Sequence, residues 1–208
     1  MPDYEIRCWD AKSFDFNSVP FVKQAFEEKK WAFVADYIRL YALYTEGGIY
    51  LDSDVKTFRS FDTFLNNEFF IGTEPLEGNQ VEVESAIMGS VKGHPYLKEC
   101  LEFYESINFR KDDGEIYATC PMIMTRILKK YGYVAEDKEQ FLETGIHVYP
   151  RTYFGHCFGT KPENYYAIHY FDGSWLEIKR GRVYKFCKRN DLMDAYLFIS
   201  KMLRFKYK

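Results

Sequence analysis

Long apolar runs and paired cysteines are both missing from this sequence. Its most apolar segment, "WAFVADYIRLYALY", is interrupted by Asp36 and Arg39, and "MPDYEIRCWD" has no basic stretch followed by an apolar one. We therefore expect neither export nor membrane spanning. The five cysteines are odd in number and form no C-x-x-C pair: Cys8, Cys100, Cys120, Cys157 and Cys187. This spacing argues against a disulfide framework and a thiolate zinc site, so we expect a reducing, cytoplasmic environment.

Repeats, low-complexity stretches and linkers are missing as well. A chain of 208 residues that is 47% hydrophobic is long enough to form one domain with a sizeable core. The formal net charge is only −3, but residues 179–208 hold 10 Lys/Arg against 2 Asp, whereas the rest holds 18 Lys/Arg against 29 Asp/Glu. No base-stacking or groove-reading motif accompanies the basic groups, so nucleic acid is not the expected partner.

The basic C-terminal segment instead favours contact with an anionic membrane surface. In "DLMDAYLFISKMLRFKYK" the apolar side chains fall near one helical face, with basic residues beside them: Leu192, Tyr196, Ile199, Met202 and Leu203 against Lys201, Arg204, Lys206 and Lys208. This pattern is typical of an interfacial helix at the inner face of a membrane. An ordinary surface helix that packs on the domain is the alternative.

Helical and extended patterns alternate along the chain. Residues 21–45 are periodic like one largely buried helix, which Gly47 and Gly48 end before the short buried strand "IYLD". We expect further strands in "YEIRCW", "EFFIGTE", "VESAIMGS", "GIHVYP" and "NYYAIHYFDGSW", and helices in "HPYLKECLEFYESI" and "CPMIMTRILKKYG". The expected fold class is α/β, with one mixed sheet and helices on both faces.

Two aspartates, Asp52 and Asp54, follow the short strand in "GGIYLDSDV". On a strand, residues two apart project to the same face, and their mutual repulsion would be removed by Mg²⁺ or Mn²⁺ that also binds phosphate oxygens. A calcium loop of the EF-hand type is excluded, because its required glycine and glutamate are replaced by Thr57 and Thr63. The alternative is that both aspartates merely cap a turn and are solvated.

Asp36 and Arg39 are the charged pair within the apolar helix before that strand. A simple ion pair three residues apart stabilises a helix by only about 0.2–0.5 kcal/mol. If the pair is buried, that gain is insufficient to explain it, because apolar residues of similar volume are often at least as favourable. Burial would therefore indicate a functional reason for the pair.

The segment "WAFVADYIRLYALYTEGGIYLDSDV" resembles the D-x-D segment of glycosyltransferase family 32. This family includes capsular polysaccharide enzymes and mannosyltransferases of the yeast type, and is related to the large glucosylating toxins. "SAIMGSVKGHPYLKECLEFYE", "CPMIMTRIL" and "YYAIHYFDGSWL" follow in the family's order, so the resemblance covers residues 1–178. It implies a GT-A fold with a mostly parallel sheet for residues 1–178. The basic segment of residues 179–208, noted above from its composition, would follow this domain as a tail. The resemblance also implies sugar transfer from a UDP- or GDP-sugar to a glycan or polysaccharide acceptor, with retention of configuration.

The resemblance also assigns roles to single residues. Asp36, Arg39 and Tyr50 match residues that contact the donor sugar or lie beside it. Asp52 would bridge the metal and the ribose, Asp54 would bind the metal, and His169 resembles a late metal ligand. Ser174 and Trp175 resemble donors to the diphosphate. Taken alone, His169 would more often be a packed strand histidine and Trp175 a core residue. Asp36, Arg39, Asp52 and Asp54 are the residues expected to carry catalysis.

The chain departs from the family at three places. Ser85 stands where relatives often have asparagine, and Cys120 where they often have glycine. Relatives also normally begin earlier, with a first strand that this sequence does not show. Loss of that strand would weaken donor binding and expose a sheet edge that favours self-association. The expected function is therefore a metal-dependent glycosyltransferase of surface polysaccharide synthesis, and the alternative is a binding remnant without turnover.

Overall fold

A computed structural model describes residues 3–10, 12–76, 80–155, 165–170 and 181–190, together with residues 192, 195, 196 and 199. The helices are α1 (Pro20–Glu27), α2 (Trp31–Glu46), α3 (Pro95–Glu105), α4 (Cys120–Leu128) and α5 (Arg182–Arg189). The strands are β1 (Gly48–Leu51), β2 (Val55–Thr57), β3 (Phe69–Pro75), β4 (Val81–Ser90), β5 (Gln140–Phe141), β6 (Ile146–Tyr149) and β7 (Ala167–His169). Short 3₁₀ turns cover Asp62–Phe64 (η1), Lys129–Tyr131 (η3) and Glu143–Gly145 (η4).

The described strands form a five-stranded sheet in the order β1-β4-β3-β6-β5 and a separate pair, β2-β7. The α/β class and the mixed sheet of a GT-A-like single domain are confirmed. A mostly parallel sheet was expected, but the five-stranded sheet is mostly antiparallel. Only β3–β6 is parallel among its described pairs, whereas β1–β4, β3–β4 and β5–β6 are antiparallel. Residues 76–80 join β3 to β4, and so short a connection allows only an antiparallel pair, since a parallel pair needs a long crossover.

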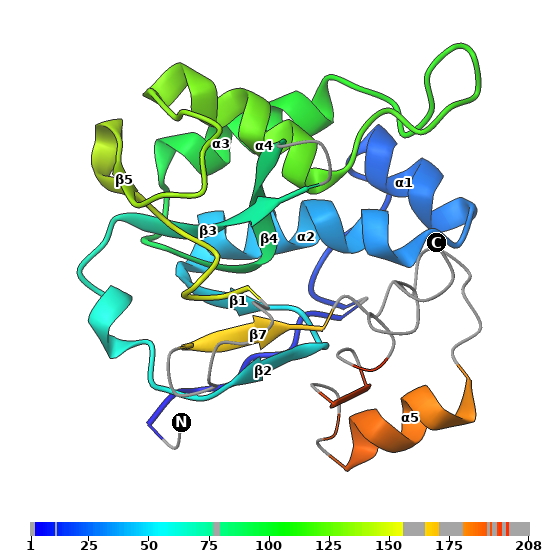
Figure 1. The fold of residues 1–208 in the computed structure, drawn as a ribbon. Helices are drawn as coiled ribbons and strands as arrows, with labels where there is room; N and C mark the ends of the chain where they lie inside the picture. The colour runs from blue at the N-terminus through cyan, green and yellow to red at the C-terminus, as the bar shows by residue number, and fades with distance from the viewer. Residues whose placement is uncertain are drawn as a thin grey trace.

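The larger core lies between one face of this sheet and helices α1–α4. Figure 1 shows α3 and α4 above strands β3 and β4, with α1 and α2 beside them and the β2–β7 pair below. Side chains from these helices pack with sheet residues such as Phe69, Ile71 and Met88, all of which are fully buried. Burial of this apolar surface is the main stabilising contribution on this side of the sheet.

The opposite face of the sheet is covered without an α-helix. Its buried cluster is made of residues from η1, β3, β4, β6 and β7, together with Phe61 and Phe154: Phe61, Phe64, Phe70, Ala86, Ile87, Tyr149, Phe154 and Ala167. The prediction of helices on both faces is therefore wrong for the described residues. Aromatic rings fill the space that helices would occupy, and the β2–β7 pair closes this side (Figure 1).

Two further local predictions are corrected. The single helix expected over residues 21–45 is divided into α1 and α2, because Lys29 adopts a left-handed backbone (φ 59°) and the amide of Lys30 turns back to the carbonyl of Ala25. "YEIRCW" contains no strand; its backbone amides pair with no sheet, although alternation alone resembled a strand. The other expected elements are present where the structure describes the chain, but the strand in "IYLD" is not buried as expected, because β1 is an edge strand with no buried residue. Most of "DLMDAYLFISKMLRFKYK" lies outside the described residues.

Gly47 sets the path from α2 into the sheet. It ends α2 with φ 75°, and a Cβ at this position would lie 2.9 Å from the backbone nitrogen of Lys92. Only glycine combines this conformation with so close an approach to the end of β4. The turn delivers β1, and the aspartates after it, to the edge of the sheet. Among the described helices, none is long and apolar enough to cross a lipid bilayer.

Candidate functional site

A pocket of about 1230 Å³ opens where β1 and β4 meet α2 and the β2–β7 pair. Its walls include six residues that the sequence predicted for the site: Asp36, Arg39, Tyr50, Asp52, Asp54 and His169. The structure therefore brings together every predicted site residue that it describes. Ser174 and Trp175 lie outside the described residues.

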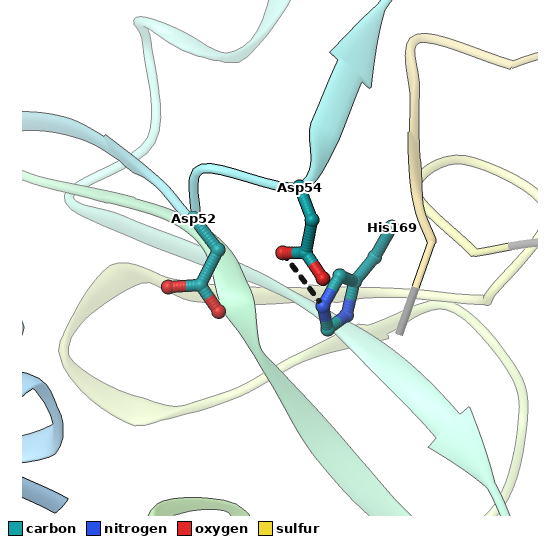
Figure 2. A group of neighbouring side chains, drawn as sticks. All are labelled: Asp52, Asp54 and His169. Carbon is teal, nitrogen blue, oxygen red and sulfur yellow. Dashed lines mark ion pairs between the residues drawn. The ribbon is translucent and has the colours of Figure 1, made fainter. Parts of the chain in front are cut away.

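Asp52, Asp54 and His169 form one cluster at this pocket (Figure 2). Each offers a potential ligand atom, and these atoms lie within 4.8 Å of one another. The strand argument for the two aspartates is wrong, because residues 52–54 form the turn between β1 and β2. The carboxylates converge because the turn reverses the chain: the Asp52 amide donates to the Ala86 carbonyl (2.9 Å), and the Val55 amide donates to the Asp52 carbonyl (3.1 Å).

His169 reaches the aspartates through strand pairing. It lies opposite Val55 in the antiparallel β2–β7 pair, next to Asp54, and its Nε2 is 3.3 Å from Oδ1 of Asp54. Its Nδ1 is 3.2 Å from Oε2 of Glu84. Burial lowers the pKa of His169, but the contacts with Asp54 and Glu84 outweigh it and raise this pKa to about 10. His169 thus lies between two carboxylates, and their negative charges favour the positively charged form of its ring.

Asp36 and Arg39 form the second part of the site, on α2. They are 9% and 6% exposed, and Nη2 of Arg39 lies 3.1 Å from Oδ1 of Asp36 and 3.4 Å from Oδ1 of Asp52. The guanidinium also lies over the ring of Tyr50, 4.9 Å from its centroid, and the Tyr50 hydroxyl donates to Oδ1 of Asp52 (2.6 Å). Arg39 thus links the helix pair to the aspartate turn, which the simple ion-pair alternative does not explain.

Ser85 and Cys120, the two positions at which this chain differs from the family, both contact the Asp36–Arg39 pair. Nη1 of Arg39 donates to the carbonyl of Ser85 (2.8 Å) and to its hydroxyl (3.2 Å). The Cys120 thiol, at the start of α4, lies 3.9 Å from the Asp36 backbone carbonyl, and the Cys120 backbone lowers the pKa of the Asp36 carboxyl, as expected for a group near the N-terminus of a helix. Burial raises the pKa of Asp36 to about 6, with Arg39 opposing the rise and Asp52 adding to it. Serine and cysteine are thus compatible with the geometry of the pair.

Sequence reasoning missed Glu84, which is only 3% exposed and contacts His169. It lies where the β3–β4 register shifts: Ile71 pairs with Met88, but Gly72 pairs with Glu84. The three intervening residues of β4 bulge out of this ladder, and Ser85 and Ala86 are the two that contact Arg39 and Asp52. The sequence did contain one signal for Glu84. It is a charged residue within "VEVESAIMGS", a segment expected to form a buried strand, and a charged group is rarely buried without a partner. Bulges often re-aim side chains beside functional sites.

Residues 1–71 match the family model described as "Glycosyltransferase sugar-binding region containing DXD motif", and the turn with Asp52 and Asp54 lies within this match. Residues 1–71 of this chain are thus similar to the sugar-binding region of that family. The sequence resemblance to D-x-D glycosyltransferases is therefore confirmed at the level of the family, and the DXD motif of the sugar-binding region is Asp52-Ser53-Asp54.

Three curated proteins are similar over longer segments. "Inositol phosphoceramide mannosyltransferase 3" of Schizosaccharomyces pombe is 32% identical over 100 residues, which are 46% of this chain and 27% of the relative. "Mannosyl phosphorylinositol ceramide synthase SUR1" of Saccharomyces cerevisiae is 30% identical over 138 residues, which are 62% of this chain and 35% of the relative. "Uncharacterized protein At4g19900" of Arabidopsis thaliana is 31% identical over 172 residues, which are 80% of this chain and 24% of the relative. The chain thus spans about a quarter to a third of the length of these relatives.

The cluster of Asp52, Asp54 and His169, called the DXD cluster below, has the ligand types that a divalent cation requires. Two carboxylates and one imidazole suit Mn²⁺ or Mg²⁺, which also bind the oxygens of a diphosphate. The side chains of Asp52 and Asp54 are 23% and 15% exposed and have partners within the site. The alternative of two solvated turn aspartates is therefore wrong, and the cluster fits a cation geometrically.

Proposed function

We propose that this chain is a metal-dependent glycosyltransferase that binds a nucleotide sugar at the DXD pocket and transfers the sugar to a glycan acceptor. One observation carries the proposal: Asp52 and Asp54 of the β1–β2 turn and His169 of β7 come together beside the buried Asp36–Arg39 pair, in one pocket. A structural cation site would not require a buried ion pair at the same cavity. The match of residues 1–71 to the DXD sugar-binding region supports the same activity.

In this proposal one set of residues binds the cation and another orients the donor sugar. Asp52, Asp54 and His169 would hold the cation, which acts as a Lewis acid on the departing diphosphate. Asp36 and Arg39 present a fixed carboxylate and guanidinium to the hydroxyls of the donor sugar, because burial and their partners prevent them from turning away. Tyr50 keeps Asp52 oriented through its hydroxyl. Such prearranged charges stabilise a transition state without reorganisation during the reaction.

The sugar and the acceptor are narrower parts of the proposal. Two of the similar proteins are named for the transfer of mannose, so mannose is the first sugar to test. Retention of configuration and a role in surface or capsular polysaccharide synthesis rest on the family resemblance. We propose a glycan hydroxyl as the acceptor, because transfer to a glycan forms a C–O glycosidic bond.

The test is incubation of the chain with a panel of UDP- and GDP-sugars, with Mn²⁺ or with EDTA. We expect one donor to release its nucleoside diphosphate in the presence of Mn²⁺ and to lose this reaction in EDTA. A glycan that accepts the sugar should increase the release. Donor binding in Mn²⁺ without hydrolysis or transfer to any acceptor would support the binding remnant instead. Stabilisation by Mn²⁺ that no nucleotide changes would indicate a purely structural cation.

Membrane contact is a further part of the proposal. The excess of basic residues over residues 179–208 should attract anionic lipid by about 1 kcal/mol for each basic group near the surface. We expect the chain to co-sediment with phosphatidylserine vesicles at low salt and to be released as the salt rises, because ions screen this attraction. A chain without residues 186–208 is the comparison. Vesicle binding that changes neither with salt concentration nor with this truncation would contradict the proposal. Self-association of the chain stays a separate prediction.

A further inference from the structure

Glu84 is a buried carboxylate that binds on two sides. Its Oε1 accepts a hydrogen bond from the backbone amide of Ala86 (2.8 Å), and its Oε2 lies 3.2 Å from Nδ1 of His169. The other ring nitrogen of His169, Nε2, is directed to Asp54 and to the candidate cation position. Glu84 and the cation position therefore lie on opposite sides of the same imidazole ring.

The bulge in β4 makes this arrangement possible. Because the register with β3 shifts after Glu84, the amide of Ala86 has no partner in the β3–β4 ladder and is available to Oε1 of Glu84. The carbonyl of the same Ala86 accepts from the amide of Asp52. Residues 84–86 thus connect the aspartate turn after β1 to the histidine of β7. A side chain held at one oxygen has little freedom left at the other.

We propose that Glu84 is a positioning residue for His169: by accepting the Nδ1–H proton in a hydrogen bond, it directs Nε2 and its lone pair at the cation between Asp52 and Asp54. This inference rests on the metal site of the proposed function. A histidine that binds a metal generally donates its other N–H to a carboxylate, carbonyl or water, and removal of that partner weakens metal affinity about 10–100-fold. Neither Asp52 nor Asp54 can play this part, because Asp54 lies on the Nε2 side and Asp52 is a ligand itself.

A carboxylate is required at this position because two donors point at it. The Ala86 amide and the Nδ1–H of His169 both need an acceptor. Glutamine has nearly the same shape but only one acceptor oxygen, so its amide group must face one of the two donors. Either His169 adopts the tautomer with the proton on Nε2, which blocks metal binding, or a buried N–H is left unsatisfied.

The test compares Mn²⁺ affinity, measured by electron paramagnetic resonance of free Mn²⁺, in the parent chain and in Glu84→Gln. We expect a 10–100-fold loss of affinity. Glu82→Gln is the matched control, because Glu82 is two residues away on the same strand, lines the same pocket and loses the same charge. We expect its affinity to stay within about twofold of the parent, as for a site whose hydrogen bonds are intact.

A double-mutant cycle separates positioning from a general structural effect. In His169→Ala, Glu84→Gln should cause no additional loss of Mn²⁺ affinity, because the residue through which Glu84 acts is gone. An equal loss with and without His169, or an equal loss in Glu82→Gln, would overturn the inference. A parent chain that binds Mn²⁺ while Glu84→Gln binds equally well would overturn it and leave the proposed function intact. A parent chain that binds no Mn²⁺ would overturn both.

A measurement on the parent chain alone covers the case in which Glu84→Gln does not fold. With Mg²⁺ bound, ¹⁵N spectroscopy of the histidine rings, assigned by comparison with His169→Ala, should show the His169 proton on Nδ1. A proton on Nε2, or the same spectrum with and without Mg²⁺, would overturn the inference.

Discussion

Replacing Asp54 by asparagine should abolish cation-dependent nucleotide binding and leave the fold in place. The carboxylate offers one of the three ligand atoms of the cluster, and asparagine removes its charge without changing its volume. The backbone is not affected, because the carbonyl of residue 54 still accepts from the amide of Tyr170 (3.1 Å). We expect the affinity for UDP or GDP in Mn²⁺ to fall by about a hundredfold or more, since the cation neutralises the diphosphate.

Isothermal titration of UDP and GDP into both chains, with Mn²⁺ and with EDTA, measures this change. In EDTA the two chains should bind equally weakly. Asp112→Asn, in an exposed loop, removes the same charge far from the cluster and is the control. Equal affinity of the parent and the Asp54 variant in Mn²⁺ would refute the assignment of Asp54 to the metal.

Replacing Asp36 by asparagine should depress sugar transfer much more than nucleotide binding. The carboxylate is held against Arg39 on α2 and is not part of the DXD cluster. Loss of one prearranged charged group typically costs about a hundredfold or more in the chemical step. We therefore expect donor hydrolysis or transfer to fall about a hundredfold, while UDP or GDP affinity changes by less than about threefold.

Steady-state rates and titrations on the same preparations separate these two effects. Glu102→Gln, at an exposed position on α3, removes a carboxylate charge remote from the pocket and is the control. If transfer, nucleotide affinity and thermal stability of the Asp36 variant all fell together, the pair would be only structural.

The pH dependence of stability gives an independent test of the buried carboxylate. Burial raises the pKa of Asp36 from 3.8 to about 6, so the folded chain holds this proton more tightly than the unfolded chain does. The resulting stabilisation is fully present below about pH 4 and is lost as the pH rises through about 6. Relative to Asp36→Asn, which has no such proton, the parent should lose up to about 3 kcal/mol over this window. Urea unfolding at pH 4–7 measures the difference, and parallel curves for the two chains would contradict a carboxyl group whose pKa is raised by burial.

Much of the site was predictable because its groups are close together in the sequence. Asp36 and Arg39 are three apart on a helix, which places them side by side in any helical structure. Asp52 and Asp54 remain neighbours whether residues 52–54 form a strand or, as observed, a turn. The family's DXD sugar-binding region also depends on a contiguous motif, so residues 1–71 identified it without a structure.

The contacts between distant segments were not predictable from such spacing. His169 alone was more typical of a packed strand residue, and its place beside Asp54 depends on the pairing of β2 with β7. Glu84 was missed because its role depends on a register shift between β3 and β4, and local periodicity does not encode register. The directions of the strand pairs were predicted wrongly for the same reason. The alternation of helices and strands indicated the α/β class, but it does not determine whether neighbouring strands are parallel or antiparallel.

The sequence by itself determined the α/β class, the resemblance to the D-x-D glycosyltransferases, and the local pairs Asp36–Arg39 and Asp52–Asp54, because short-range spacing decides which side chains share a turn or a helix face. Tertiary structure alone decided that α1–α4 lie on one face of the sheet, that the Arg39 guanidinium reaches Asp52, and that Glu84 holds His169. These contacts join segments from separate elements. Their formation depends on which apolar faces pack and on which strand register buries them, and both are properties of the folded chain as a whole.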